Sequence, residues 1–339
     1  MPNQPFDLTP REMNYREAIK IALLQEMRRD ENVLLLGEDI GAFGGVYAVT
    51  RGLLDEFGAG RVIDTPISEA GFMGLAVGAA VAGKRPVVEI MYMDFLGVCA
   101  DILINQAPKM RGMSGGQLTV PLVVRTQTGG WRASGAQHSQ SLEMMVANVP
   151  GIKIVIPSTP ADVHGLLRQA IRDDNPVLIM EHRLLYGTKG FVDPAADPIP
   201  FGQALVRRSG GDVTLIATSM SVHNALAAAN ELEEEGIDAE VIDLRTIVPL
   251  DQETILDSVR KTRRAVVVHQ AHRTFGPGGE IASLIHENAF ESLLAPVARV
   301  GSLDIVVPAN TALEGDVLPS KPAIVAAAID VMQPRPAHV

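Results

Sequence analysis

The chain has 339 residues, of which 47% are hydrophobic and only 4% aromatic, and its formal net charge is −11. At about 150 residues per domain, this length suits two domains with full cores. The negative charge gives binding to nucleic acid or to an anionic membrane little electrostatic support. The high apolar content predicts that part of the surface is buried in an assembly.

The cysteine content and the absence of targeting signals favour a cytoplasmic protein. The one cysteine, Cys99, lies in the apolar run FLGVCADILI and is expected in the core. With a single cysteine the chain cannot form an intrachain disulfide, and no Cys/His spacing typical of a metal site occurs. No signal or transit sequence is recognisable. The longest uncharged run, 70–83, is too short and too rich in glycine to span a bilayer.

Buried strands and helices alternate along the N-terminal half. The first helix is expected to begin after Asn14, because Glu17 three residues later gives a capping-box pattern. Short apolar runs predict strands buried on both faces. They are VLLLG at 33–37, VVEIM at 87–91, LVVRT at 122–126, IKIVIP at 152–157 and PVLIMEH at 176–182. With helical stretches between most of them, a parallel sheet covered on both sides is predicted.

A proline- and glycine-rich segment, YGTKGFVDPAADPIPFG at 186–202, interrupts this alternation. We therefore predict two domains, at 13–186 and 205–335, joined by a linker at 187–204. The alternation restarts with DVTLIAT, a helix through ALAAANELEEEG, AEVIDL, a helix from about Asp251, RAVVVHQ, and a helix after FGPGGE. The predicted class is α/β, with two domains that are each a mainly parallel sheet flanked by helices.

Glu69 is the first candidate for chemistry. It stands at the head of a helical stretch that has no further charge until Lys84. A carboxylate buried beside such a surface is costly without a dedicated partner. In a dry site its proton affinity rises, so it can exchange a proton with a bound ring nitrogen. The alternative is a first-turn acid that the helix dipole favours.

Loops beyond the carboxyl ends of parallel strands usually hold ligands. The loop QTGGWRASGAQHSQS, after LVVRT, carries Trp131 and His138. A histidine on such a loop can donate a proton near neutral pH or bind an anionic intermediate; the alternative is a solvated side chain. Ser139 and Ser141 have no G-x-S-x-G setting, which disfavours a hydrolase.

A second polar feature is the helix end at 173–175, before Pro176. The last carbonyls of a helix carry partial negative charge. Carbonyls of Ala170 and Ile171, with the side chain or carbonyl of Asp173, could ligate a monovalent cation; an ordinary turn is the alternative.

Nucleotide-binding motifs are missing. FGPGGE at 275–280 lacks the G-x-G-x-x-G order, and no Walker A lysine motif occurs. His269 and His272, at the preceding strand end, are therefore expected in the core or at an interface.

Together these motifs resemble a known family. The matching segments are MNYREAI, LLGEDIGAFGGVYAVTRGL, RVIDTPISEAGFMGLAVGAA, NQAPKMRGMSGGQ, GAQHSQSLE, PGIKIVIPSTPADVHGLL, IRDDNPVLIMEH and AEVIDLRTIVPLD. The chain resembles the β subunit of the thiamine-diphosphate-dependent decarboxylating component of 2-oxo acid dehydrogenase complexes. This family includes pyruvate, branched-chain and acetoin enzymes. The resemblance implies a pyrimidine-binding domain followed by a transketolase C-terminal-like domain.

The resemblance also implies roles for individual residues. Glu69 would hydrogen-bond a pyrimidine ring nitrogen of thiamine diphosphate, and His138 would assist reductive acyl transfer to a lipoyl arm. Phe95 is expected beside the pyrimidine, with Tyr92 and Met93 left open. The family's potassium site would use Leu122, Ala170, Ile171, Asp173 and Asn175.

The chain should hold only half a site. It has no G-D-G…N-N motif for the Mg²⁺ that anchors the diphosphate, so an α subunit must supply those ligands. The resemblance implies a heterotetramer of two α and two β chains docked on a lipoylated acyltransferase core.

The substrate stays open. We expect pyruvate or another 2-oxo acid as the first candidate substrate. Acetoin is kept as the second candidate, because the segment IMYMDFLGVCADILINQ looks closer to the acetoin-cleaving branch. A non-catalytic assembly subunit would be expected to lose Glu69 or His138, and both are present. The missing dinucleotide fingerprint disfavours an NAD-linked reductase.

Overall fold

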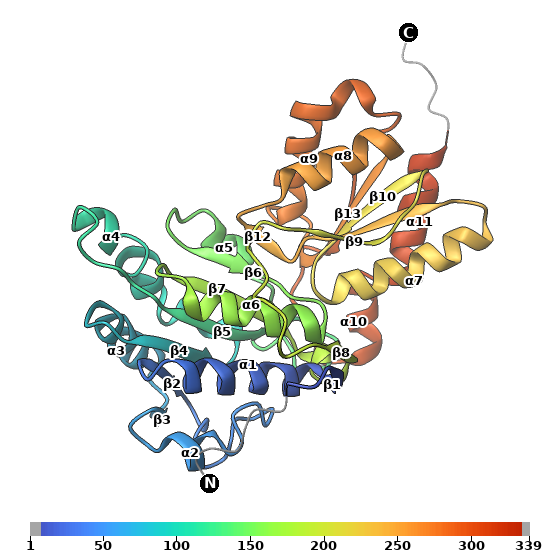
Figure 1. Cartoon of the computed structure of the whole chain (residues 1–339). Coiled ribbons are helices and arrows are strands. Elements are labelled where there is room, and N and C mark those ends of the chain that lie inside the picture. Colours follow the sequence, from blue (N-terminus) through green and yellow to red (C-terminus); the bar gives the residue numbers. More distant parts are fainter. Residues whose placement is uncertain (1–7, 334–339) are drawn as a thin grey trace. The chain divides into compact units, whose positions relative to one another are not determined.

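The structure, a computed structural model, describes residues 8–333 (Figure 1). It divides into two compact units. The first comprises the chain up to Thr128 together with 145–201, and the second comprises 129–144 together with the chain from Gly202 on. Each unit is an α/β structure, as the sequence predicts. No helix between residues 8 and 333 is long and apolar enough to cross a membrane.

The first unit is built on parallel strands in the order β6-β7-β5-β4-β2-β3. Its strands are β1 (Arg11–Asn14), β2 (Val33–Gly37), β3 (Val62–Asp64), β4 (Arg85–Ile90), β5 (Val123–Thr128), β6 (Lys153–Val155), β7 (Val177–His182) and β8 (Lys189–Val192). Its helices are α1 (Tyr15–Arg29), α2 (Leu53–Phe57), α3 (Glu69–Val81), α4 (Met110–Met113) and α6 (Pro160–Arg172), with short helices at Met93–Gly97, Ile102–Gln106 and Arg183–Gly187. α5 (Glu143–Ala147) begins in the segment that belongs to the second unit.

Local sequence determines several of these boundaries. The side chain of Asn14 accepts a hydrogen bond of 2.9 Å from the backbone N–H of Glu17, so the predicted cap of α1 is confirmed. The five predicted strands correspond to β2, β4, β5, β6 and β7. The proline- and glycine-rich segment holds one further strand, β8, which pairs antiparallel with β1.

A buried ionic cluster joins the three central strands of this sheet. Arg125 on β5 is 1% exposed, and its guanidinium bonds the carboxylates of Glu89 on β4 and Glu181 on β7 at 2.7 Å each. The hydroxyl of Tyr186 donates to Glu181 at 2.6 Å. Burial outweighs the attraction of Arg125 and raises the pKa of Glu89. Removing one partner would leave a buried charge uncompensated, so the cluster fixes the spacing of the strands.

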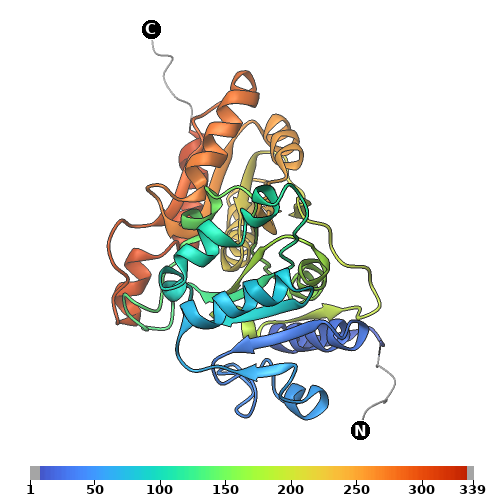
Figure 2. The ribbon, with the colours of Figure 1, turned by 90° about the vertical axis from the view of Figure 1, so that its left-hand side faces the viewer.

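Figures 1 and 2 both show α2 beyond β3, the last strand of this sheet.

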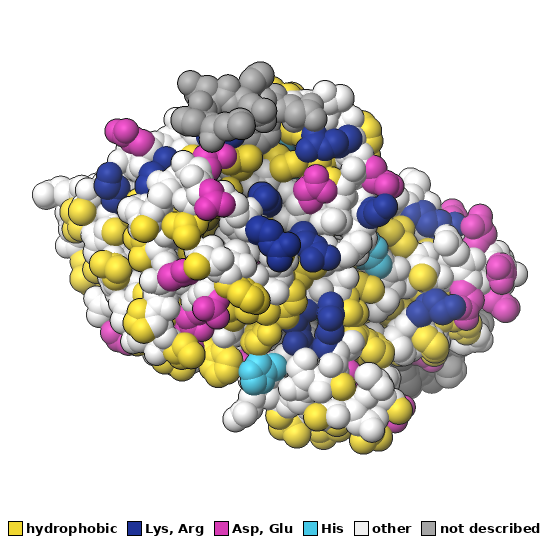
Figure 3. Space-filling model, turned by 90° about the horizontal axis from the view of Figure 1, so that it is seen from below, with side chains coloured by type: hydrophobic (Ala, Val, Ile, Leu, Met, Phe, Trp, Pro, Cys, Tyr) yellow, Lys and Arg dark blue, Asp and Glu magenta, His cyan; other side chains and the backbone are white. Residues whose placement is uncertain are grey.

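Figure 3 shows one face of the molecule, where apolar side chains lie exposed among basic and acidic ones. In the first unit the exposed apolar residues include Ile67, at 83% exposure, and Phe43, at 67%. The composition predicts such exposed apolar surface.

The second unit has its own sheet, in the order β14-β13-β10-β11-β9, in which only β9 is antiparallel to its neighbour. Its strands are β9 (Leu205–Arg208), β10 (Val213–Ala217), β11 (Ala239–Asp243), β12 (Thr246–Val248), β13 (Ala265–His272) and β14 (Ala298–Ser302). Its helices are α7 (Met220–Glu234), α8 (Gln252–Thr262), α9 (Pro277–Ala289), α10 (Thr311–Val317) and α11 (Lys321–Met332), with a short helix at Phe290–Ser292.

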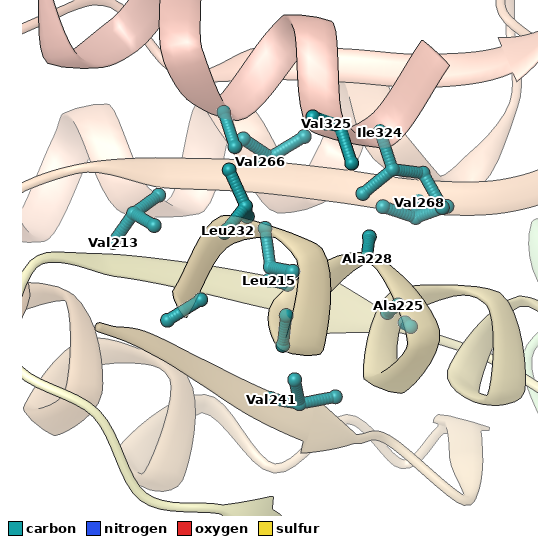
Figure 4. Packing of buried hydrophobic residues seen from close by; sticks show 14 of the residues in the cluster. Val213, Leu215, Ala225, Ala228, Leu232, Val241, Val266, Val268, Ile324 and Val325 are labelled. Atoms are coloured by element: carbon teal, nitrogen blue, oxygen red, sulfur yellow. The ribbon is translucent and has the colours of Figure 1, made fainter. Parts of the chain in front are cut away.

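Helices cover both faces of this second sheet. α7 and α11 pack on one face through small aliphatic side chains such as Ala228 and Ile324, which meet Leu215, Val266 and Val268 of the sheet (Figure 4). α8 and α9 pack on the other face in a second apolar cluster. Small side chains allow this close helix–sheet packing.

Candidate functional site

Glu69 is the first residue of α3 and is only 8% exposed. No hydrogen bond or ion pair of its carboxylate is found within residues 8–333. The helix N-terminus stabilises the negative charge in part, but a buried carboxylate still needs a donor. Glu69 is therefore a largely buried acid with no hydrogen-bonding side chain beside it in the described structure.

A second carboxylate, Glu38, lies near Glu69. It follows β2 directly, and its Oε1 is buried without a hydrogen-bond partner in the described structure. Burial raises the pKa of Glu38, and the negative charges of Glu69 and Asp39 raise it further. Thr65, after the neighbouring strand β3, has a buried hydroxyl that is also unpartnered within residues 8–333.

The sequence analysis did not single out Glu38. Glu38 opens the loop after Gly37, which follows the carboxyl end of the buried strand β2, the kind of position at which parallel sheets hold ligands. Adjacent pairing of β2 and β3 brings the segment after Gly37 close to the approach to α3. Local sequence patterns do not reveal which strands pair, so they could not place Glu38 near Glu69.

The segment after β4 carries Tyr92 and Phe95. The hydroxyls of Tyr92 and Tyr47 lie 3.3 Å apart, and the guanidinium of Arg183 lies 5.3 Å from the centre of the Tyr92 ring. Tyr47 in turn stacks on Tyr186 at 4.7 Å. Tyr92 thus packs among side chains of its own unit, whereas Phe95 is a partly buried residue of the short helix Met93–Gly97.

Cys99 is 1% exposed, which confirms the prediction that it lies in the core. Burial raises the pKa of its thiol to about 11, and the charge of Glu69 adds to this shift. A thiol with such a pKa stays protonated and unreactive at neutral pH.

His138 lies on a loop, 129–144, that belongs to the second unit and is attached to α10. The backbone N–H of Ala133 donates to Glu314 Oε2 at 2.8 Å, and Glu314 is fully buried. At Gly130 an added Cβ would come within 2.5 Å of a methyl group of Leu318, so the loop packs closely against this side chain. His138 itself is partly buried. Glu69 and His138 are therefore held by different units.

A buried acid, Glu143, lies at the end of this loop, where α5 begins. Glu143 is 2% exposed, and its Oε2 has no partner among the described residues. Burial raises its pKa to about 7. The hydroxyl of Ser139, beside His138 in the sequence, is likewise buried without a partner in the described part of the chain. The sequence analysis missed Glu143, because its burial depends on how the loop packs.

The five residues of the expected potassium site gather around the end of α6. The backbone N–H of Val177 donates to the Leu122 carbonyl at 2.8 Å, and that of Asp173 donates to the Ala170 carbonyl at 3.2 Å. Arg85 Nη1 donates to the carbonyls of Ile171 and Asp173 at 3.2 and 3.1 Å. Each carbonyl oxygen has two lone pairs, so one acceptor position remains on each singly bonded carbonyl, while the guanidinium of Arg85 already brings a positive charge to the carbonyls of Ile171 and Asp173.

The carboxylate of Asp173 is occupied within the chain. Lys153 Nζ donates to it at 2.6 Å, and the backbone and side-chain amides of Asn175 donate at 2.9 Å each. These donors lower the pKa of Asp173.

Comparison with known proteins defines the family. Residues 11–189 match the family described as transketolase, pyrimidine binding domain, and residues 202–324 match transketolase, C-terminal domain. The pyruvate dehydrogenase E1 component subunit beta of Rickettsia felis is 46% identical over 93% of this chain and 97% of its own length. The chain belongs to the family of E1 β subunits. The family and fold predicted from the sequence are thus confirmed.

An acetoin enzyme is almost equally similar. The β subunit of the acetoin:2,6-dichlorophenolindophenol oxidoreductase of Cupriavidus necator is 44% identical over 95% of this chain and 98% of its own length. A solved structure described as a split-gene transketolase, inactive β4 tetramer, superimposes with a TM-score of 0.78. It covers 94% of this chain and 98% of its own at 23% identity, and thus supports the fold.

We predict that Glu143→Gln reduces the pH dependence of stability. The pKa of Glu143 in the folded chain is about 7, above its ordinary value of 4.5. The native state therefore binds the proton more tightly, and stability falls as the pH rises from 4.5 through 7. Melting temperatures at pH 5 and pH 8 should differ less in the variant than in the wild type, by roughly 2 °C or more. Glu12→Gln, at an exposed acid, is the control; equal slopes in both variants would contradict the assignment.

Proposed function

We propose that this E1 β subunit serves a thiamine-diphosphate-dependent 2-oxo acid dehydrogenase, with pyruvate as the first-choice substrate, and passes the acyl group to lipoyl groups of an acyltransferase core. Glu69 carries the proposal, because its buried carboxylate has no partner within residues 8–333. A ring nitrogen of the cofactor is a donor of the kind such a group needs. When bound, thiamine diphosphate supplies the nucleophilic carbon and the electron sink.

The residues around Glu69 control where the proton resides. Glu69 would hold a proton in a hydrogen bond to the pyrimidine ring. Burial, and then the negative charge of the nearby Glu69, raise the pKa of Glu38. Phe95 would pack beside the ring, since Tyr92 already packs with Tyr47 and Arg183.

His138 would act in the second half of the reaction. Its loop is fixed to α10 by the Ala133–Glu314 hydrogen bond. A histidine at this position can donate a proton to the sulfur of a lipoyl arm as the acyl group leaves. Because the loop is attached to α10, His138 can take fewer orientations. Proton transfer requires the donor to be held in the right geometry to its acceptor.

The partner in this proposal is an α subunit that supplies the Mg²⁺ and diphosphate ligands, in a heterotetramer of two α and two β chains. Ile67 supports an interface near the site, because this large apolar side chain is 83% exposed two residues before Glu69. The domain bounds 13–186 and 205–335, the linker at 187–204 and a cytoplasmic location are parts of the same proposal.

Acetoin is the second candidate substrate. The similarity to the acetoin enzyme of Cupriavidus necator, 44%, is close to that of the pyruvate enzyme of Rickettsia felis, 46%. Initial rates of the co-expressed α and β chains with pyruvate, branched-chain 2-oxo acids and acetoin would decide between them. The largest kcat/KM identifies the substrate.

Glu69→Gln should leave the fold and the assembly with the α subunit intact but remove most decarboxylation, by about 100-fold or more. The amide keeps the shape and lacks the carboxylate. The measurement is turnover of the purified complex with an artificial electron acceptor. Glu17→Gln, at a partly exposed first-turn acid of α1, is the matched control. Near-normal turnover of the Glu69 variant would exclude the role given to Glu69.

His138→Ala should impair acyl transfer to lipoyl domains more than decarboxylation, because only the first needs a proton at the lipoyl sulfur. Both rates are measured on one preparation, with lipoyl domain and with an artificial electron acceptor. Gln137→Ala, the exposed neighbour on the same loop, should retain both rates. Equal losses in the two assays of the His138 variant would count against this division of roles.

A potassium ion at Leu122, Ala170, Ile171, Asp173 and Asn175 should stabilise the chain. Replacing K⁺ by tetramethylammonium at constant ionic strength should lower the melting temperature by roughly 2 °C or more. Asn175→Ala should reduce the difference between the two salts. Identical melting curves in both salts would contradict a bound potassium ion.

A further inference from the structure

An exposed hollow lies in the second unit, beyond the carboxyl ends of β13 and β14. It measures about 460 Å³, and its walls are formed by His272, Thr274, Phe275, Asp304, Ile305 and Val306. The apolar side chains of Phe275, Ile305 and Val306 are 91%, 54% and 74% exposed. Large apolar side chains that gather at one place on a surface, unlike single exposed ones, indicate an interaction site.

Hydrogen bonds between the two walls give this hollow its shape. The backbone N–H and the hydroxyl of Thr274 donate to the carboxylate of Asp304 at 3.3 and 2.5 Å. His272 Nδ1 donates to the carbonyl of Leu303 at 2.7 Å. Between these bonds and α9, Phe275 has a φ of +57°, which is unfavourable for a bulky residue. The fold therefore keeps a strained phenylalanine exposed, and strained residues that persist in a fold often belong to functional sites.

The hollow suits a protein surface better than a small molecule. A pocket for a small ligand buries most of the surface of that ligand. Here Phe275 and Val306 have most of their own surface in water, so a small molecule between them would stay largely solvated. A partner protein can cover both side chains at once.

The apolar walls also favour a partner that stays bound. Interfaces of permanent complexes are more apolar than those of partners that dissociate. A lipoyl domain leaves after each acyl transfer, and its departure would return Phe275 and Val306 to water each time. A permanently bound subunit keeps both side chains covered.

A second copy of this chain is a poor occupant on electrostatic grounds. A twofold contact brings the same patch of both copies together, so the two Asp304 carboxylates would enter one interface. Two chains that each carry a net charge of −11 also repel one another.

The hollow adjoins the loop that carries His138. The backbone N–H of Leu303 donates to the carbonyl of Val317, at the end of α10, at 2.9 Å. A few residues beyond the hollow, the Cβ of Ala309 would lie 3.4 Å from a Cβ added at Gly135, three residues before His138. A subunit that covers the hollow therefore lies beside this loop.

We propose that the α subunit covers the hollow and seats an apolar side chain between Phe275 and Val306. The inference rests on the proposed function, in which the α subunit holds the diphosphate of the cofactor on whose acyl group His138 acts. A subunit that holds this cofactor must lie next to the loop of His138. The α subunit then contacts the second unit at the hollow, in addition to the surface near Ile67.

The test is the affinity of a purified α subunit for the full-length chain and its variants, measured by biolayer interferometry. Phe275→Ala and Val306→Asp should each weaken binding by about tenfold or more, because they remove or charge a central apolar contact. Phe290→Ala is the matched control, at a phenylalanine that is 67% exposed and directly follows α9. The 13 residues of α9 separate it from Phe275 by roughly 20 Å, so this variant should bind as the wild type does.

Melting temperatures of the isolated variants exclude poor folding as the cause, and they should equal that of the wild type because the replaced side chains are exposed. Unchanged α binding in both hollow variants would overturn the proposal, as would equal weakening by Phe290→Ala. With unchanged α binding, a raised KM for lipoyl domain would identify that domain as the occupant, and reduced self-association would identify a second copy. The proposed function is tested separately, by turnover of the wild-type and Glu69→Gln complexes.

Discussion

The placement of Glu69 in a largely buried position without a hydrogen-bonding side chain beside it is the constraint on which the proposed site depends. Glu69 is placed at the head of α3 among small apolar side chains, and its neighbour Glu38 is another acid rather than a donor. Removing these charges from water without pairing them costs free energy. In the proposed function a cofactor ring nitrogen would offset that cost, and the half-site proposal rests on the missing motif for the Mg²⁺ that anchors the diphosphate.

The rest of the first unit makes this placement rigid. The ionic cluster of Arg125 with Glu89 and Glu181 joins β4, β5 and β7 below their carboxyl ends, from which the candidate residues project. Tyr186 extends the cluster to Tyr47 and from there to Tyr92. Breaking a buried pair of this kind is strongly destabilising. The ionic cluster thus fixes the spacing of β4, β5 and β7.

The sequence predicts the features that are local. The cap at Asn14, the strands with continuous apolar runs and the α/β class follow from short-range patterns. β3 was missed, because three residues give no periodicity. Glu38 and Glu143 could not be identified as buried, unpartnered groups, because burial depends on contacts between distant segments. The loop that carries His138 groups with the second unit, and its Ala133 is hydrogen-bonded to Glu314 there. These two residues are 181 positions apart in the sequence, so local patterns could not predict the contact.

The most direct test of this account is calorimetric binding of thiamine diphosphate, with Mg²⁺, to the purified chain alone and to the chain co-purified with an α subunit. The account predicts stoichiometric uptake by the complex and no tight binding by the chain alone, because in the proposed half-site Glu69 would contact only the pyrimidine ring and the α subunit would supply the Mg²⁺ and diphosphate ligands. Tight, stoichiometric binding by the chain alone, accompanied by full turnover, would contradict it.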